Sequence, residues 1–184
     1  MAAAVPSVAL FADDQPAEAG EWRVLFPEDG QPEGWQARHW ADVSQPAQGE
    51  AKWEVKDGVL LGGEPRGNWL ISDEEFSDFI LEYEFKLGAR GNSGCALRTP
   101  MAHDPAFDGL ELQMADLRYN LEAKPSELTG GLYRAIAPKQ QIYLPEQWNR
   151  YRIELRAASS KSISNLPSHL DLDMAEEAGE ACRH

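Results

Sequence analysis

The chain has 184 residues, a size that suits one domain with its own hydrophobic core. Its formal net charge of −14 at pH 7 argues against a nucleic-acid partner, because phosphate binding needs clustered Lys and Arg and the sequence has no basic run. The longest uncharged apolar stretch, residues 2–12, is well short of the ~20 residues of a membrane-spanning helix. We therefore expect no nucleic acid and no membrane span, and an uncharged small-molecule substrate.

Residues 1–20 have the composition of a leader. Small and apolar residues precede Asp13 and Asp14, as in a secretory signal, but no Lys or Arg comes before them. Leu10 also stands where a small residue is expected before a cut after Ala12. The sequence leaves two interpretations open, a signal remnant or a disordered leader, and favours the periplasm or the exterior over the cytoplasm.

Short strands separated by turn signals follow the leader. The patterns predict strands at residues 22–26, 52–55, 59–62, 69–72, 78–87, 93–99, 109–116, 132–137 and 148–156. Asp57-Gly58 lies between two of them and predicts a tight hairpin. Residues 34–46 show no sustained period and predict a long loop, and residues 117–128 predict an excursion loop with at most one helical turn.

No segment has the pattern of an amphipathic helix, so the fold class is all-β and antiparallel, with two packed sheets over residues 21–156. Residues 157–184 lose the alternation, being first small and polar and then acidic. We expect this atypical tail to be disordered or truncated.

The most informative stretch is residues 109–116, where apolar and polar side chains alternate. On a strand the apolar even positions would fill a core, while Glu111 and Gln113 project from the opposite face, roughly 7 Å apart along it. Asp116 has the other parity, so it can join them only if the strand bends or ends near Ala115.

Several short motifs occur in a fixed order around this stretch. They are Trp53-x-x-x-Asp57-Gly58-x-Leu60, Ser77-Asp78-Phe79, Asn92-Ser93-Gly94, Arg98, Gly109-x-Glu111-x-Gln113-x-x-Asp116, Thr129-Gly130, Leu132-Tyr133 and Trp148-Asn149-x-Tyr151. Together they resemble the bacterial 3-keto-disaccharide hydrolase domain family over residues 21–156. The resemblance implies the concanavalin A-like lectin and glucanase fold, a two-sheet jelly roll with a concave sugar-binding face. It also implies cleavage of glycosides that carry a ketone at sugar carbon 3.

The sequence departs from that family after Leu155. Members that look like it continue with a Gly turn, a strand with an Asn-Gly hairpin and a closing strand, and residues 157–184 contain none of these. We therefore expect a sandwich that is incomplete at its C-terminal end, with exposed strand edges.

The implied reaction needs a general base, a donor or divalent metal for an enolate oxygen, and an acid for the leaving group. The ketone makes the hydrogen on carbon 2 acidic, so a base can remove it and the group on carbon 1 can depart, after which water is added back. We predict Glu111 as the base, Arg98 and Gln113 as oxygen-binding donors, and Asp116 as an acid or metal ligand. His103 is the second candidate metal ligand.

Further residues are candidates for contact with the sugar. They are Asn92, His103, Tyr133, Trp35 and Trp69. Each site residue also has an ordinary structural alternative: a solvated sheet face for Glu111 and Gln113, an ion pair for Arg98, and packing for Tyr133. Trp53 and Trp148 are expected in the core.

Two other functions fit the same strand. A lectin-like module would bind sugar through the same face without a competent base. The Glu-x-Gln-x-x-Asp pattern also looks like the Glu-x-Asp-x-x-Glu signature of laminarinase-type glucanases, but the shorter Asp works against the ~5–5.5 Å carboxyl spacing of retaining hydrolysis.

Overall fold

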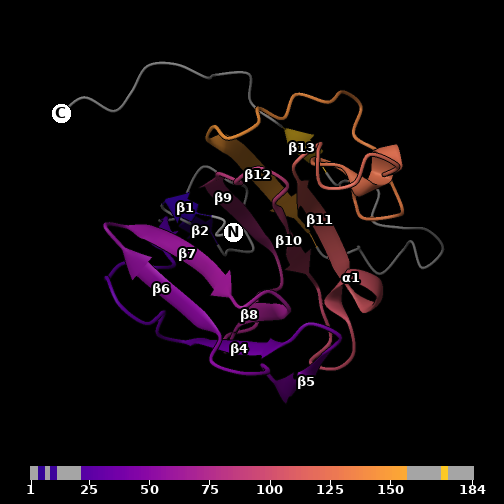
Figure 1. Ribbon diagram of the computed structural model, residues 1–184. Coiled ribbons are helices and arrows are strands. Elements are labelled where there is room, and N and C mark those ends of the chain that lie inside the picture. Colours follow the sequence, from indigo (N-terminus) through magenta and orange to yellow (C-terminus); the bar gives the residue numbers. More distant parts are fainter. Residues whose placement is uncertain (1–3, 7–8, 12–21, 157–170, 174–184) are drawn as a thin grey trace, which may run out of the picture.

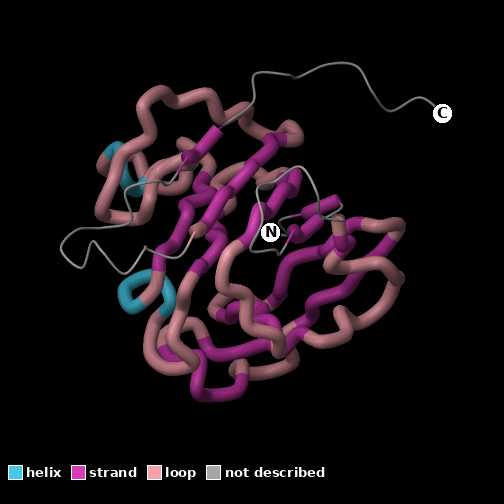
Figure 2. Tube along the Cα trace, turned by 180° about the vertical axis from the view of Figure 1, so that it is seen from behind, coloured by secondary structure: helices cyan, strands magenta, loops and turns pink. Residues whose placement is uncertain are grey.

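A computed structural model describes residues 4–6, 9–11, 22–156 and 171–173, which are almost entirely strand and loop (Figures 1 and 2). The strands are β1 (Ala4–Pro6), β2 (Ala9–Phe11), β3 (Arg23–Val24), β4 (Trp35–His39), β5 (Asp42–Pro46), β6 (Lys52–Lys56), β7 (Val59–Glu64), β8 (Asn68–Ser72), β9 (Phe79–Phe85), β10 (Asn92–Leu97), β11 (Leu110–Ala115), β12 (Asn149–Leu155) and β13 (Asp171–Asp173). The helical elements are α1 (Pro105–Asp108) and the 3-10 turn η1 (Pro125–Glu127).

Hydrogen bonds join these strands into four groups. The strand orders are β1-β7-β6, β5-β4-β8, β10-β11 and β13-β12-β9-β2-β3, and the described pairings are antiparallel. The predicted all-β antiparallel sandwich is confirmed in its class, although its strands form several hydrogen-bonded groups where two sheets were expected.

The hydrophobic core gathers side chains of β9 and β12 with those of β10 and β11. Phe85, Tyr151 and Ile153 are almost completely shielded from solvent, and the Phe85 and Tyr151 ring centroids lie 4.8 Å apart. Leu112 and Met114 of β11 belong to the same cluster. Because burial of each large apolar side chain contributes ~1.5–3 kcal/mol, these alternating positions hold the layers together.

The hairpin at Asp57-Gly58 is confirmed. Both residues have positive φ, 52° and 72°, which the two central residues of a type I′ turn require. The Asp29 carboxylate accepts hydrogen bonds from both of their N–H groups, at 3.0 and 3.2 Å. These bonds also hold the pKa of Asp29 below its ordinary value.

The prediction of a loop over residues 34–46 is wrong, because this segment forms the β4–β5 hairpin. Trp35 packs against the core, and Gln36 and Arg38 take the opposite face of β4. Val43 of β5 is fully buried, between the half-buried Asp42 and the exposed Ser44. These strands are short and flanked by turn-forming residues, so their alternation of buried and exposed positions is too brief to give a sustained period in the sequence.

The predicted strand at residues 132–137 is also wrong, because the chain reverses within it. Leu132 donates its N–H to Ile136 O at 2.9 Å, and Ile136 returns the bond at 3.0 Å. The extended part lies just before this turn, where residues 130–133 run alongside β11. They do so through hydrogen bonds from Gln113 N to Gly131 O (2.9 Å), from Gly130 N to Gln113 O (3.2 Å) and from Tyr133 N to Glu111 O (2.8 Å).

The ends of the chain lie mostly outside the described residues, and the predicted leader and tail stay predictions. The backbones of β1, β2 and β13 pair with β7, β9 and β12 respectively.

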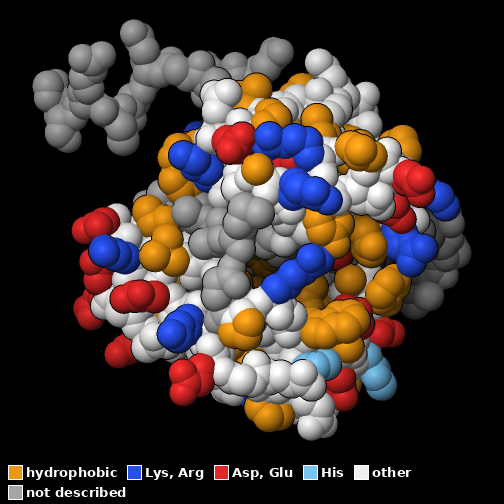
Figure 3. Space-filling model, in the orientation of Figure 1, with side chains coloured by type: hydrophobic (Ala, Val, Ile, Leu, Met, Phe, Trp, Pro, Cys, Tyr) orange, Lys and Arg blue, Asp and Glu red, His pale blue; other side chains and the backbone are white. Residues whose placement is uncertain are grey.

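Trp53 packs against the core as expected, but Trp148 is 40% exposed, so its core assignment is wrong. Figure 3 shows basic and acidic side chains interspersed on the face it presents, without a continuous basic area. In the described part of the chain no helix has the length and apolar character needed to cross a membrane.

Candidate active site

Strand β11 is buried on both faces. Even positions enter the core, and the opposite face carries Glu111 and Gln113, whose residues are only 8% and 3% exposed. Helix α1 packs on β11, and residues 130–133 flank its edge. The solvated-face interpretation of Glu111 and Gln113 is therefore wrong, because neighbouring segments exclude most of the water.

The Glu111 carboxyl has an unusual protonation equilibrium. Burial raises its pKa to about 7, and the negative charge of Asp104 adds to the rise. Asp104 is held in place as the N-cap of α1, where its side chain accepts from Ala106 N–H at 3.0 Å. Among the described residues none donates a hydrogen bond to the Glu111 carboxyl, so it can accept a proton near neutral pH.

Gly94 supplies the space in which the Glu111 side chain lies. The two residues are on neighbouring strands, with Gly94 opposite Gln113 and Ala96 opposite Glu111. A Cβ atom at Gly94 would come within 1.9 Å of Glu111 Oε1 and 2.7 Å of its Cγ and Cδ. The carboxyl thus lies flat across the backbone of β10 only because residue 94 has no side chain.

Gln113 lies two residues from Glu111 on the same face of β11. Its side-chain oxygen accepts from Met114 N–H at 3.0 Å, and since a backbone N–H can only donate, the accepting atom is Oε1. No described residue accepts from Nε2. The Gln113 backbone oxygen is fixed by the Tyr151 hydroxyl of β12 at 2.7 Å.

An aromatic pair borders Glu111 on its other side. The bridge between Leu112 and Leu132 puts Tyr133 opposite Glu111, on the same face. The Tyr133 ring lies 6.1 Å from Phe107 of α1 in an edge-on arrangement, and the Arg134 guanidinium lies 5.8 Å and 6.0 Å from the two ring centroids. Partial burial and the nearby carboxylates of Glu127 and Glu111 raise the pKa of Tyr133, so its hydroxyl is neutral and able to donate at neutral pH.

Phe107 is the site residue that sequence reasoning missed. It is 61% exposed although it is aromatic, and it is the sole Phe, Tyr or Trp between the predicted strands at residues 93–99 and 109–116. A single aromatic side chain in a polar loop between two strands was the available signal.

With this geometry in place, sequence comparison gives the family. The model of the 3-keto-alpha-glucoside-1,2-lyase-like domain matches residues 21–180, which is most of the chain. The chain belongs to this family. The match extends beyond Arg156, where the sequence motifs had ended, and membership supports a carbohydrate-active role for this lyase-like domain.

A solved structure shares the fold. The lyase-like domain is similar to the crystal structure of a candidate glycosyl hydrolase from Parabacteroides distasonis, with a TM-score of 0.55 and 22% sequence identity. The similarity covers 73% of this chain, which spans 64% of the length of that structure. No curated protein matches the sequence.

The structure of the lyase-like domain gives Asp116 a different role from the predicted one. It follows the end of β11 on the core-side parity and is fully buried. Arg118 donates to it from backbone N (3.0 Å), Nε (2.7 Å) and a terminal nitrogen (2.9 Å), and the Tyr143 hydroxyl donates at 3.3 Å. These donors hold the pKa of Asp116 far below its ordinary value, so Asp116 does not supply an acid. The laminarinase-type alternative therefore lacks its second catalytic carboxyl.

Other predicted residues also have structural partners. Arg98 ends β10 with φ 50°, donates to Ser77 O at 3.3 Å and forms an ion pair with Asp78 at 3.7 Å. No positive charge of Arg98 lowers the Glu111 pKa, which burial and Asp104 raise. Arg98 thus fits its ion-pair alternative better than the donor role.

His103 and Asn92 lie at the margins. The His103 backbone joins its loop to β5 by accepting from Val43 N and donating to the Asp42 carboxylate, both at 3.0 Å. Asn92 is exposed at the first position of β10. Within residues 4–6, 9–11, 22–156 and 171–173, no three His, Cys, Asp or Glu side chains cluster to hold a metal. A metal at Asp116 or His103 stays a prediction.

The two tryptophans predicted as sugar platforms differ. The Trp35 ring packs 5.0 Å from Phe26 at the edge of the core, which removes it from a binding rim. Trp69 is half-buried on β8 and donates its ring N–H to Trp40 O at 3.1 Å.

Proposed function

We propose that the lyase-like domain cleaves glycosides whose sugar carries a ketone at carbon 3, with Glu111 as the general base. The observation that carries this proposal is the buried Glu111 carboxyl, with its pKa near 7 and no described hydrogen-bond donor. A base of this strength is half ionised at neutral pH, which suits removal of a weakly acidic hydrogen.

The reaction follows from the acidity that the ketone confers. Glu111 takes the hydrogen of carbon 2 as a proton, and the electrons of that bond form an enolate with the carbon 3 oxygen. When the ketone re-forms, a double bond forms between carbons 1 and 2 and the bond from carbon 1 to the leaving oxygen breaks. The leaving oxygen takes up a proton, and addition of water across the double bond completes hydrolysis.

Two neighbours of Glu111 can serve the oxygens in these steps. Gln113 Nε2 is available to donate to the enolate oxygen, where a preorganised donor in a water-poor site stabilises developing charge. The neutral Tyr133 hydroxyl, opposite Glu111 on the same face, is our candidate to donate a proton to the leaving oxygen. Phe107 and Tyr133 offer aromatic surface for the apolar face of a sugar ring.

Glu111→Gln tests the proposal directly, because it removes the base and keeps the shape. We expect turnover of a 3-keto-glucoside to fall ~10²–10⁴-fold while binding of the same compound is retained. Glu84→Gln, at an exposed position of β9, is the matched control and should leave turnover unchanged.

The pH dependence provides a second test. Because the base acts only when ionised, kcat/KM of the wild type should rise about tenfold per pH unit below 7 and level off above it. Normal turnover by Glu111→Gln would remove Glu111 from the mechanism. A wild type that binds unoxidised glycans and never cleaves a 3-keto-glucoside would instead be a lectin-like module.

A further inference from the structure

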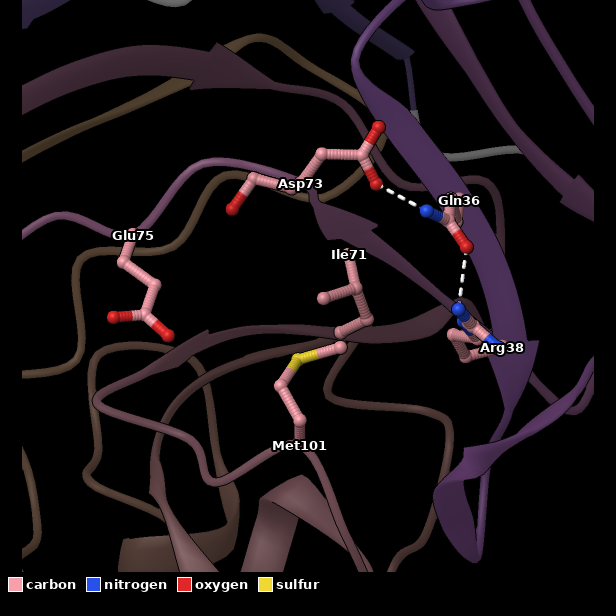
Figure 4. A pocket seen from close by; sticks show the side chains of 7 residues that line it. Gln36, Arg38, Ile71, Asp73, Glu75 and Met101 are labelled. Carbon is pink, nitrogen blue, oxygen red and sulfur yellow. Dashed lines mark hydrogen bonds between the residues drawn. The ribbon is translucent and has the colours of Figure 1, made fainter.

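A pocket of about 180 Å³ lies on the sheet that contains β4 and β8, away from Glu111 in the sequence. Gln36 and Arg38 of β4, Ile71 of β8 and the following Asp73 and Glu75 line it, together with Met101 from the loop after β10 (Figure 4). In register, Gln36 is opposite Ile71 and Arg38 is opposite Trp69. These side chains occupy the face of β4 and β8 opposite the one that sends Trp35 and Leu70 to the core.

One wall of the pocket is a fixed polar chain. Arg38 donates to the Gln36 side-chain oxygen, and Gln36 donates from Nε2 to the Asp73 carboxylate. The amide orientation of Gln36 is therefore set by its two partners. None of the ion pairs among the described residues includes Arg38, so its charge remains available beside the pocket.

The opposite wall carries Glu75, and apolar side chains lie between the two walls. Figure 4 shows the Glu75 carboxylate across the pocket from Gln36 and Arg38, with Ile71 and Met101 between them. Met101 is 51% exposed. No hydrogen bond or ion pair within the described part of the chain engages Glu75.

This arrangement defines the chemistry of a ligand. Asp73 and Glu75 can only accept hydrogen bonds and Arg38 can only donate, so a ligand must offer both kinds of group within a short span. Hydroxyl groups do both, and Ile71 with Met101 supplies an apolar surface for the C–H face of a ring. The volume is below the ~300–1,000 Å³ of pockets that enclose drug-sized ligands, which fits a single ring.

The loop that follows β10 contributes to the pocket and also carries a residue whose charge acts on Glu111. Met101 precedes Asp104 by three residues, a separation of at most ~11 Å along the chain. Asp104 is the residue whose charge acts on Glu111. Met101 of the pocket and Asp104 beside Glu111 thus belong to the same loop.

We propose that the pocket between β4, β8 and Met101 is a carbohydrate subsite that binds one neutral pyranose ring. That this ring is the unoxidised unit of a 3-keto-disaccharide rests on the proposed function. Binding of a plain sugar ring in the pocket does not.

Binding of methyl α-D-glucopyranoside to the Glu111→Gln protein tests the subsite without turnover, with saturation-transfer NMR and titration calorimetry as readouts. Glu75→Gln and Met101→Ala in that background should each weaken binding about three- to tenfold, since one removes a charged acceptor and the other the apolar surface. Glu84→Gln and Leu121→Ala, both exposed and outside the pocket, are the matched controls.

The outcomes separate this proposal from the proposed function. Sugar binding that is weakened by the two pocket variants supports the subsite even if wild-type turnover is never found. The subsite proposal is overturned if the protein does not bind the sugar, or if the pocket variants leave sugar binding unchanged. It is also overturned if the pocket binds the small cation ethanolamine and not the sugar. These outcomes count even if Glu111 proves to be the base.

Discussion

The two ends of β11 carry carboxylates that are both buried and behave in opposite ways. Burial and Asp104 raise the pKa of Glu111 to about 7. Asp116, just past the other end, has its pKa strongly lowered by Arg118 and its backbone donors. Burial alone penalises a charge at both positions, so the difference comes from whether donors are placed around the carboxyl.

Tyr143 is the third member of the hydrogen-bonded group formed by Asp116 and Arg118. Burial and the neighbouring Asp116 carboxylate raise the pKa of Tyr143 to about 12, which keeps its hydroxyl available as a donor. At the Asp116 end of β11 the carboxylate is fully hydrogen-bonded, whereas at the Glu111 end the carboxyl has no described donor and can take up a proton. The comparison supports a stabilising role for Asp116 and is consistent with the proposed role of Glu111 as a base.

Asp116→Asn tests the stabilising role of the carboxylate at the Asp116 end of β11. We expect the free energy of unfolding at pH 7 to fall by about 2–3 kcal/mol, because the buried Asp116 carboxylate loses its charge-assisted hydrogen bonds with the half-exposed Arg118 side chain. Since the folded pKa is lowered, the stabilisation is present above the unfolded pKa near 3.8 and is lost as the pH falls below it. Urea denaturation at pH 7 and pH 3 measures both effects, and equal stability of variant and wild type at pH 7 would contradict the assignment.

Glu111→Gln should act in the reverse direction on stability. The folded pKa of about 7 exceeds the ordinary glutamate pKa of 4.5, so the stability penalty is absent below pH 4.5 and grows as the pH rises to 7. At pH 8 the wild type carries a cost of up to about 3 kcal/mol that the neutral glutamine avoids. Urea denaturation should therefore show a variant more stable than the wild type at pH 8 and equal to it at pH 4; the same difference at both values would mean that Glu111 does not titrate in this range.

Gly94→Ala sharpens the comparison by moving the Glu111 carboxyl without changing its chemistry. The added Cβ would overlap Glu111 Oε1, so the side chain must leave its position across β10. We expect kcat to fall about tenfold, because a displacement near 1 Å already disturbs catalytic geometry. Ala96→Gly, on the same face of β10, is the control for backbone effects, and full activity of Gly94→Ala would show that the position of Glu111 is not critical.

The smallest expected effect is at the aromatic border of the Glu111 end. Phe107→Ala should raise KM for a 3-keto-glucoside about three- to fivefold and leave kcat nearly unchanged, since stacking holds the sugar but moves no proton. Leu121→Ala, at an even more exposed apolar residue, should change neither constant. A fall in kcat with constant KM would instead give Phe107 a role in arranging Tyr133.

The parts of the fold that the sequence predicted are those with long alternation or strong turn chemistry. The pattern of β9 and β12 survives in the structure because one side of each strand fills the core over its whole length. The hairpin after Lys56 follows from the positive φ that Asp57 and Gly58 adopt. Strand β4 was missed because its five residues are too few to establish a period, and residues 132–137 were mistaken because apolar residues in a tight turn resemble a strand.

The candidate site divides along similar lines. Strand parity was enough to place Glu111 and Gln113 on one face, since side chains two apart share it. The partners of Arg98 and Asp116 were not predictable, because Asp78 lies 20 positions earlier in the chain than Arg98 and a two-residue contact such as Asp116 to Arg118 depends on how the strand ends. Burial of Glu111, from which its pKa follows, required knowledge of the segments that cover β11.

The Tyr151 hydroxyl fixes the position of β11 relative to its neighbouring segments. The Tyr151 hydroxyl of β12 donates to Gln113 O and accepts from Gly130 N, both at 2.7 Å. A single oxygen atom therefore fixes the spacing of β12, β11 and residue 130, so a substitution that moves β12 would also move the Glu111 carboxyl without altering a residue beside it. Redesign of the candidate site for another ligand therefore has to keep the position of β12.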